Sequence, residues 1–246
     1  MNILSLINII VLISIILECI YSFYKKDGGH SFSGTSGNIL RAIVSYAFQK
    51  NIPILILLYT WLELANKAND NVTIKSFIFC LLILDLSRYL LHKANHHFSF
   101  LWALHSVHHS DKNVNLSTSY RVSWFEQIYS FLIIIPLVLL DYNFTIIAFS
   151  LYIMGIHSLF CHNCYINLPR FVDHLFITPE NHRVHHDEHM ENQNSNYGNL
   201  FSIWDRMFGT FVRTKENIVF GIKGYHQDNF IKMETEPILN YFKINN

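Results

Sequence analysis

The chain is poor in charge, cysteine, proline and glycine, and each shortage excludes a class of protein. Only 15% of its 246 residues are charged, well under the roughly 25% of an ordinary soluble domain, and 18 basic residues balance 18 acidic ones. A nucleic-acid-binding protein would show a basic excess, so no nucleic-acid partner is expected. Four cysteines make no disulfide framework, and 5 prolines with 9 glycines exclude collagen-like and low-complexity chains. The abundant residues are apolar ones, at 51%, and histidine, at 15 residues.

Five long apolar runs predict an all-α, multi-pass membrane protein with about 4–5 spans. They cover residues 3–20, 42–64, 72–91, 124–140 and 143–160. The first is long enough to cross about 30 Å of hydrocarbon. A cleaved signal peptide is the alternative for it, but a positive start and a small-residue cleavage site are missing. A buried soluble bundle is the alternative for the whole set, although five such runs exceed what a single soluble core hides. Only Asp141 and Tyr142 separate the last two runs, which predicts a tight helical hairpin at 124–160.

Basic residues in the short loops predict the orientation of these spans. Lys25, Lys26 and Arg41 follow the first run, whereas the link between the fourth and fifth runs has no Lys or Arg. Since Lys and Arg favour the cytoplasmic side, the N-terminus is expected outside and the C-terminus in the cytoplasm. This topology places the histidines of 92–109 and 162–189 on the cytoplasmic side.

Two segments outside the apolar runs are polar. Residues 28–37 are rich in Gly and Ser but lack the Gly-Lys-Ser/Thr of a phosphate-binding loop, so a flexible connector is expected. The chain from Arg213 onward is polar with one short apolar-aromatic patch, and we expect it to form an amphipathic cap.

Histidine recurs in three closely spaced clusters. Residues three and four apart on a helix share one face, with Cβ atoms about 5–6 Å apart. Imidazoles so placed can converge on one ion at about 2.0–2.1 Å. An isolated pair would be weak evidence, because exposed helices carry such pairs by chance. The three clusters together are His92 and His96; His105, His108 and His109; and His182, His185 and His186.

The number of clustered histidines predicts two bound metal ions, because one ion would leave too many imidazoles over. His162 and His157, at the end of the fifth run, are further candidate ligands. Imidazole alone accepts zinc, copper, iron and nickel. A structural zinc site would favour cysteine ligands, and a nitrogen-rich pair of sites at a membrane surface favours iron and O2 chemistry.

The clusters and their flanks resemble the fatty acid hydroxylase superfamily, which includes sterol desaturases. The resemblance covers residues 84–211. Asp85-Leu-Ser-Arg-Tyr-Leu-Leu-His92 resembles the entry to the first histidine box, and Leu101-Trp-Ala-Leu-His105-Ser-Val-His108-His109-Ser-Asp111, with Asn115 and Arg121, resembles the second. Thr178-Pro-Glu-Asn-His182-Arg-Val-His185-His186 is similar to the third. Asn196-Tyr-Gly198 and Trp204-Asp-Arg-Met-Phe-Gly-Thr210 resemble the block that ends the domain.

The resemblance implies a helical membrane protein whose cytoplasmic histidines hold two irons and activate O2. It implies an N-terminal transmembrane region at 1–83, the catalytic domain at 84–211 and a polar tail at 212–246. It also implies one more histidine before the third box, and His162 matches that position. Asn163-Cys164 departs from the Ser-Asn found in many members.

Four polar residues could orient the ligating imidazoles by accepting their second N–H. The alternative for Asp85 is an ion pair with Arg88, and for Asp205 it is Arg206 or a helix end. The candidates are Asp85, Asp111, Asn115 and Asp205.

These patterns together predict a membrane oxidoreductase that takes two Fe ions, O2 as co-substrate and a lipid substrate. Zinc is the alternative metal in a purified form. The chain has no strand–GxGxxG–helix unit and no four-cysteine spacing, so electrons are expected from a ferredoxin or a b-type cytochrome with its reductase. The open alternatives are a metal-dependent membrane hydrolase or isomerase and a non-catalytic metal-binding protein.

Overall fold

The computed structural model describes residues 3–51, 73–213, 217–223, 225 and 229–244. Over these residues the chain is mostly helical and forms no β-strand, only the isolated bridges Phe176–Phe201 and Asp187–Phe220. The elements are α1 (Ile3–Lys25), α2 (Phe32–Asn51), α4 (Ile74–His97), α5 (Ser99–His109), η1 (Leu116–Tyr120), α6 (Trp124–Tyr129), η2 (Ser130–Ile134), α7 (Ile135–Leu139), α8 (Phe144–Cys161), η3 (Val172–His174), α9 (Pro179–His185), α10 (Met190–Gln193), α11 (Ile203–Met207) and α12 (Phe230–Ile244).

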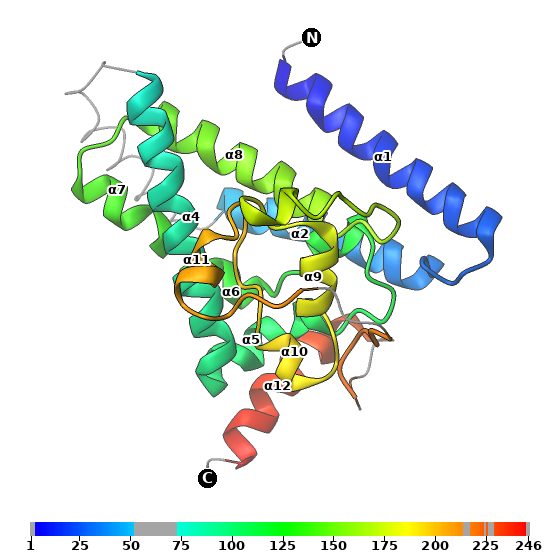
Figure 1. The fold of residues 1–246 in the computed structure, drawn as a ribbon. Coiled ribbons are helices and arrows are strands. Elements are labelled where there is room, and N and C mark those ends of the chain that lie inside the picture. Colours follow the sequence, from blue (N-terminus) through cyan, green and yellow to red (C-terminus); the bar gives the residue numbers. More distant parts are fainter. Residues whose placement is uncertain (1–2, 52–72, 214–216, 224, 226–228, 245–246) are drawn as a thin grey trace.

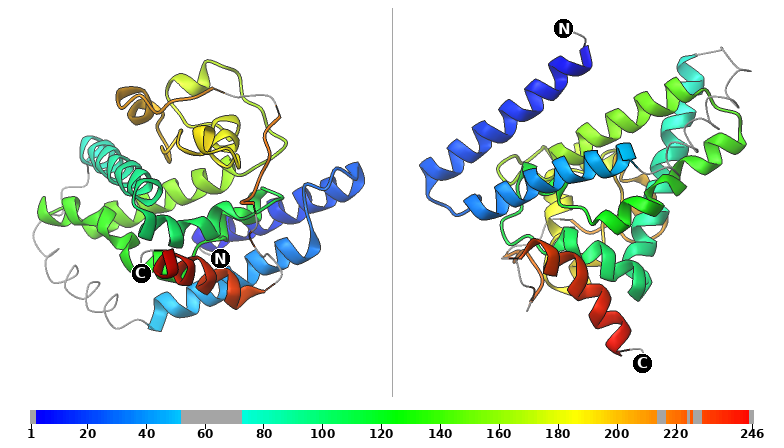
Figure 2. Two further views of the ribbon diagram at one scale, coloured as in Figure 1. Left: turned by 90° about the horizontal axis from the view of Figure 1, so that it is seen from below. Right: turned by 180° about the vertical axis from the view of Figure 1, so that it is seen from behind.

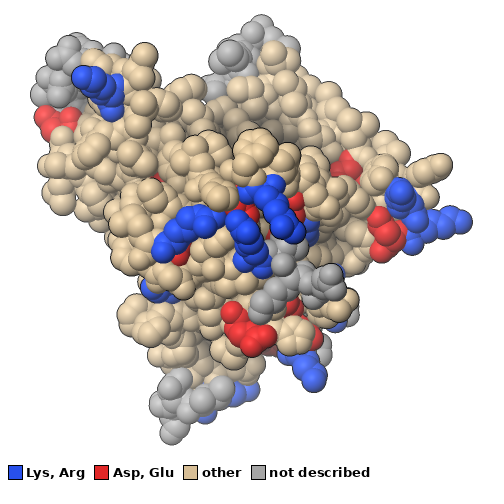
Figure 3. Space-filling model, viewed as in Figure 1, with Lys and Arg blue, Asp and Glu red and all other residues tan. Residues whose placement is uncertain are grey.

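α1 and α8 lie at one end of the molecule, whereas α5, α9, α10 and α12 lie toward the other, and α4 connects the two ends (Figures 1 and 2). Charged side chains are sparse over α8 and most of α1 and gather below these helices in the view of Figure 3. The molecule therefore has an apolar part and a polar part.

Two of the described helices are long and apolar enough to cross a membrane. They cover Leu6–Lys25 and Phe144–Cys161. Most apolar side chains of α1 face outward, for example Leu17 and Ile20 at 59% exposure each. Exposed apolar side chains on this scale fit a lipid environment better than water.

The other predicted spans differ from expectation. The run at 124–140 is broken into α6, η2 and α7, with Pro136 in the first turn of α7, where its missing N–H costs nothing. The run at 72–91 belongs to a longer helix, α4, whose Lys75, Asp85 and Arg88 lower its hydropathy. Most of the run at 42–64 lies outside the described residues. The flexible connector predicted at 28–37 is shorter than expected, because α2 already begins at Phe32.

The apolar core joins α4, η2, α7 and α8. Its buried residues are Cys80, Leu84, Ile133, Leu137, Ile146, Ile147 and Met154. α4 starts at a capping box, in which the Thr73 hydroxyl accepts from the Ser76 N–H, and ends where extended Phe98 turns the chain into α5. Since α4 and α5 pack together, the first two histidine clusters come side by side.

The C-terminal helix α12 packs against α5. Its Glu234 is buried against Arg41 of α2, and the Ser123 hydroxyl donates to the same carboxylate at 2.8 Å. A buried charge pair held by further hydrogen bonds fixes the relative position of the helices that carry it. This contact ties α2 and α12 to the segment that follows α5.

Candidate metal centre

Four helix ends bring the predicted histidines together. His92 and His96 lie in the last turns of α4, and the second cluster lies on α5. His162 caps the C-terminus of α8, and the third cluster ends α9. α9 begins with Thr178 at its N-cap and Pro179 in its first turn, which fixes where the helix starts. Its His182 and His185 are buried.

Nine histidines form two adjacent groups. In each group the candidate ligand nitrogens all lie within 4.8 Å of one another. The two groups touch, since the rings of His109 and His186 stack with centroids 4.6 Å apart. The first group is His92, His96, His105, His109 and His185, and the second is His108, His162, His182 and His186.

In the second group the hydrogen bonds fix which nitrogen carries the proton. His108 Nδ1 lies 3.1 Å from the Arg121 carbonyl oxygen, and His162 Nδ1 lies 2.7 Å from the Ser158 carbonyl oxygen. A carbonyl only accepts, so both Nδ1 atoms are protonated and donate. Each Nε2 then carries a lone pair, and the two Nε2 atoms face each other at 3.3 Å. Two lone pairs at this distance repel unless a cation lies between them.

The same arrangement recurs in the first group. His92 Nδ1 donates to the Tyr197 carbonyl at 2.8 Å, and His105 Nδ1 donates to the Glu126 carboxylate at 3.0 Å. The Nε2 atoms of His92 and His105 face each other at 3.1 Å. Nitrogens each about 2.1 Å from one ion are about 3.0–3.4 Å apart, so both pairs fit two ligands of one metal ion.

Burial favours the neutral form of at least four of the grouped imidazoles, which is the form that binds a metal ion. Burial lowers the pKa of His162 to about 4 and that of His185 to about 3. Burial, followed by the neighbouring histidines, holds the pKa of His108 and His109 well below the usual range. Among the described residues, His109 has no hydrogen-bond partner on either nitrogen. Buried polar atoms without a partner are costly, and a bound metal would satisfy them.

Glu126 of α6 is a site residue that the sequence reasoning missed. Its two carboxylate oxygens lie 3.0 and 3.1 Å from His105 Nδ1, and the Asn95 amide donates to it at 3.1 Å. A carboxylate on the far nitrogen of a ligand fixes the ring and raises its basicity. The available signal was a lone acidic residue inside the apolar run 124–140.

Asp85 and Asp205 do not contact an imidazole, contrary to expectation. Asp85 accepts from the Leu200 and Phe201 backbone N–H groups and the Trp204 indole, and it forms no ion pair with Arg88. Asp205 accepts from the Tyr197 N–H at 2.8 Å. Both carboxylates therefore shape residues 197–204, whose Tyr197 carbonyl orients His92.

Asp111 and Asn115 are also bonded elsewhere. Asp111 accepts from the Asn38 amide and the Thr118 hydroxyl, and Asn115 caps η1 by accepting from the Ser117 N–H. These contacts join α2 to the loop after α5. Backbone carbonyls and Glu126 take the role that the sequence reasoning gave to these four residues.

His157 stands outside both histidine groups. Its Nδ1 donates to the Asn199 carbonyl at 2.9 Å and lies 3.5 Å from the Cys161 sulfur. The structure thus separates His157 from His162, although both lie at the same end of α8. We do not propose it as a ligand.

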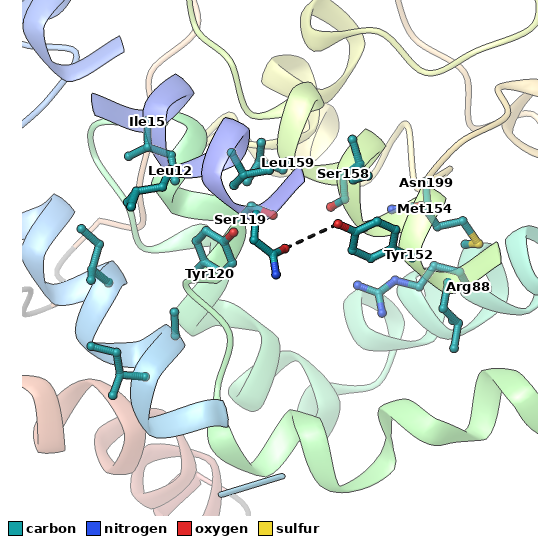
Figure 4. Close-up of a pocket in the computed structure, with 18 of the residues that line it drawn as sticks. Leu12, Ile15, Arg88, Ser119, Tyr120, Tyr152, Met154, Ser158, Leu159 and Asn199 are labelled. Carbon is teal, nitrogen blue, oxygen red and sulfur yellow. Dashed lines mark hydrogen bonds between the residues drawn. The ribbon is translucent and has the colours of Figure 1, made fainter. Parts of the chain in front are cut away.

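An apolar cavity of about 580 Å³ lies between α1, α2 and α8 (Figure 4). Its walls include Leu12 and Ile15 of α1 and Leu159 of α8. At one end it shares Arg88, Ser119, Ser158 and Asn199 with a smaller gap lined by histidines of both groups. A volume in the range of small-molecule sites, mostly apolar and ending at candidate metal ligands, suits a long apolar ligand.

A helical protein with two touching, nitrogen-only groups of buried histidines is a candidate dinuclear metal protein. A family profile described as fatty acid hydroxylase matches residues 77–210, more than half of the chain. The chain belongs to the fatty acid hydroxylase family, which confirms the resemblance predicted from the histidine clusters.

Curated relatives share the greater part of this chain. Alkylglycerol monooxygenase of Danio rerio is 26% identical over 212 residues, which are 85% of this chain and 47% of the relative. Lathosterol oxidase of Mus musculus is 28% identical, covering 71% of this chain and 54% of the relative. Ornithine lipid hydroxylase of Rhizobium tropici is 29% identical, covering 64% and 48%. The chain thus spans about half the length of these relatives. No solved structure matches it.

Proposed function

We propose that this chain is a membrane-embedded, iron-dependent oxidoreductase that uses O2 to hydroxylate or desaturate a lipid. The observation that carries the proposal is the pair of facing Nε2 lone pairs in each histidine group, at the end of an apolar cavity. The names of the relatives, a monooxygenase, an oxidase and a hydroxylase acting on lipids, support the reaction type.

The nine histidines of the two groups would hold two Fe ions. Iron bound there would supply redox chemistry with O2, which can attack an unactivated C–H bond. In a hydroxylation one oxygen atom enters the C–H bond and the other leaves as water, at the cost of two electrons and two protons. The residues of this chain would bind the ions, keep the imidazoles neutral and position the lipid. Zinc is the alternative ion, because imidazole also binds it well.

The distribution of apolar surface supports a substrate that enters from the membrane. The exposed apolar side of α1 belongs to the helix that lines the cavity through Leu12 and Ile15. In the proposed orientation α1 and α8 cross the bilayer, and the histidine groups with the C-terminal helix lie on the cytoplasmic side. A lipid tail would gain about 0.8 kcal/mol for each buried CH2 group.

Metal analysis and O2 consumption test the proposal. The purified protein should hold about two iron ions per chain after iron loading, and membrane lipid extract should stimulate its O2 consumption in the presence of reductant. A metal-dependent hydrolase or isomerase would turn over lipid without O2, and a metal carrier would bind ions without turnover. Either result, or a metal content near one, contradicts the proposal.

Turnover should also require a separate electron donor. The sequence has no dinucleotide-binding motif and no iron–sulfur motif that would carry electrons to the histidine groups. We expect product only when a ferredoxin or a b-type cytochrome with its reductase is added to NAD(P)H. Product formation by this chain with NAD(P)H alone, measured by mass spectrometry, would contradict this expectation.

A further inference from the structure

Arg88 places a positive charge where the apolar cavity meets the histidines. It lies on α4, four residues and about one turn before His92, and lines both the cavity and the smaller gap beside the histidine groups. Its guanidinium points into the cavity below Tyr152 (Figure 4). The side chain is half-buried.

No carboxylate of the described residues forms a close ion pair with this guanidinium, although the charges of Arg88 and Glu126 attract each other across the gap that both residues line. Among the described residues Arg88 forms no ion pair within 4.0 Å. Asp85, one turn earlier, is bonded to residues 200, 201 and 204. Glu126 lines the same gap, but its oxygens are bonded to His105 and Asn95.

The rest of the cavity offers Arg88 only neutral groups. Its other polar lining groups are hydroxyls and amides, and the remaining walls are apolar. A charge withdrawn from water among apolar walls is unfavourable unless an opposite charge joins it. A guanidinium has five N–H donors in a plane that matches the oxygens of a carboxylate or a phosphate.

We propose that Arg88 binds the anionic end of a lipid, a carboxylate or a phosphate, with its tail in the apolar cavity. The tail would lie against Leu12 and Ile15 of α1, Ile39 and Ile43 of α2, and Leu151 and Leu159 of α8. The inference rests on the proposed function and narrows its substrate class from any lipid to an anionic one. It makes Arg88 a specificity-determining residue.

Three probes of equal tail length separate the charge from the tail. Hexadecanoate, hexadecyl phosphate and hexadecanol would be titrated against the iron-loaded protein in detergent, each displacing a fluorescent fatty acid. In the unsubstituted protein at least one anion should bind about tenfold or more tightly than the alcohol. Arg88→Gln should abolish that preference while leaving affinity for the alcohol within about twofold, and Arg88→Lys should keep part of it.

The matched control is Arg170→Gln, which removes an exposed arginine that does not line the cavity. It should leave all three affinities unchanged. Metal content of each variant shows that the site is still folded. Loss of preference for only one anion supports the proposal and identifies the carboxylate or the phosphate as the group recognised.

Two results overturn the proposal, and they are distinguishable from failure of the proposed function. If Arg88→Gln leaves the preference for the anions intact, or if the unsubstituted protein binds the alcohol as tightly as both anions, Arg88 recognises no anion, although lipid oxidation can still hold. If none of the three probes binds the unsubstituted protein, the cavity takes no lipid, and the proposed function fails with it.

Discussion

Replacing His185 by alanine should lower the metal content from about two ions per chain to about one and abolish activity. His185 contributes its Nε2 to the first histidine group, and its ring lies 4.5 Å from that of His92 and 4.6 Å from that of His109. The Ser195 carbonyl, 2.7 Å from Nδ1, holds the ring toward the group. Changes to residues that only orient a ligand typically cost about 10–100-fold, so loss of a ligand itself should cost more than about 100-fold. Metal analysis and product formation measure both effects.

His157→Ala is the matched control for this experiment. His157 is half-buried and, like His185, donates one hydrogen bond to a backbone carbonyl, but it lies outside both groups. It should retain two ions per chain. Membrane insertion should be unchanged in both variants, because His185 lies outside the two helices that can cross a membrane. Two bound ions and full activity in His185→Ala would contradict the dinuclear site.

The three histidine clusters could be predicted from the sequence because helix geometry alone places their members on one face. Spacings of three and four residues hold on any helix, so His105, His108 and His109 could be grouped without knowledge of the fold. Helix spacing alone could not predict which clusters lie next to each other in the folded protein. His162 was found by its position in the chain relative to the third cluster, and only the packing of α8 against α9 brings it beside His182.

The orienting groups could not be predicted, because backbone carbonyls carry no side-chain signature. The carbonyls of Tyr197, Arg121 and Ser195 are aimed by tertiary contacts between distant segments. Asp85 is a side chain whose type was informative but whose partner was not. A buried aspartate can accept hydrogen bonds from an imidazole or from backbone N–H groups, and the sequence around Asp85 does not distinguish these partners.

Apolar length was also an incomplete guide to the spans. Residues 124–140 are apolar enough to suggest one helix, yet the helix is interrupted at Ser130 and resumes around Pro136. Proline favours a helix start, because it lacks an N–H and fixes its own backbone angle. The first piece of this broken run, α6, carries Glu126, and its carboxylate contacts His105. A single membrane-spanning helix predicted from apolar length gives no reason to expect that contact.

Glu126→Ala should release one of the two metal ions far more readily than the other. The carboxylate accepts from His105 Nδ1 and fixes this ring so that Nε2 faces His92 at 3.1 Å. His108 and His162, in the second group, are oriented by backbone carbonyls and do not depend on Glu126. The loss should therefore fall on the first group, with metal affinity reduced about 10–100-fold, and should appear as one fast phase when a chelator removes the ions.

Glu126→Gln tests whether Glu126 acts by positioning the His105 ring or whether its replacement damages the fold in general. The glutamine amide oxygen can still accept from His105 Nδ1, so this variant should recover most of the affinity. Asp141→Asn is the control, since it removes a carboxylate from an exposed turn with a positive φ of 57°, which asparagine tolerates, far from either group. It should release both ions as slowly as the unsubstituted protein does. If Glu126→Ala weakens both ions equally, or if glutamine fails to restore what alanine removes, Glu126 does not act by orienting His105.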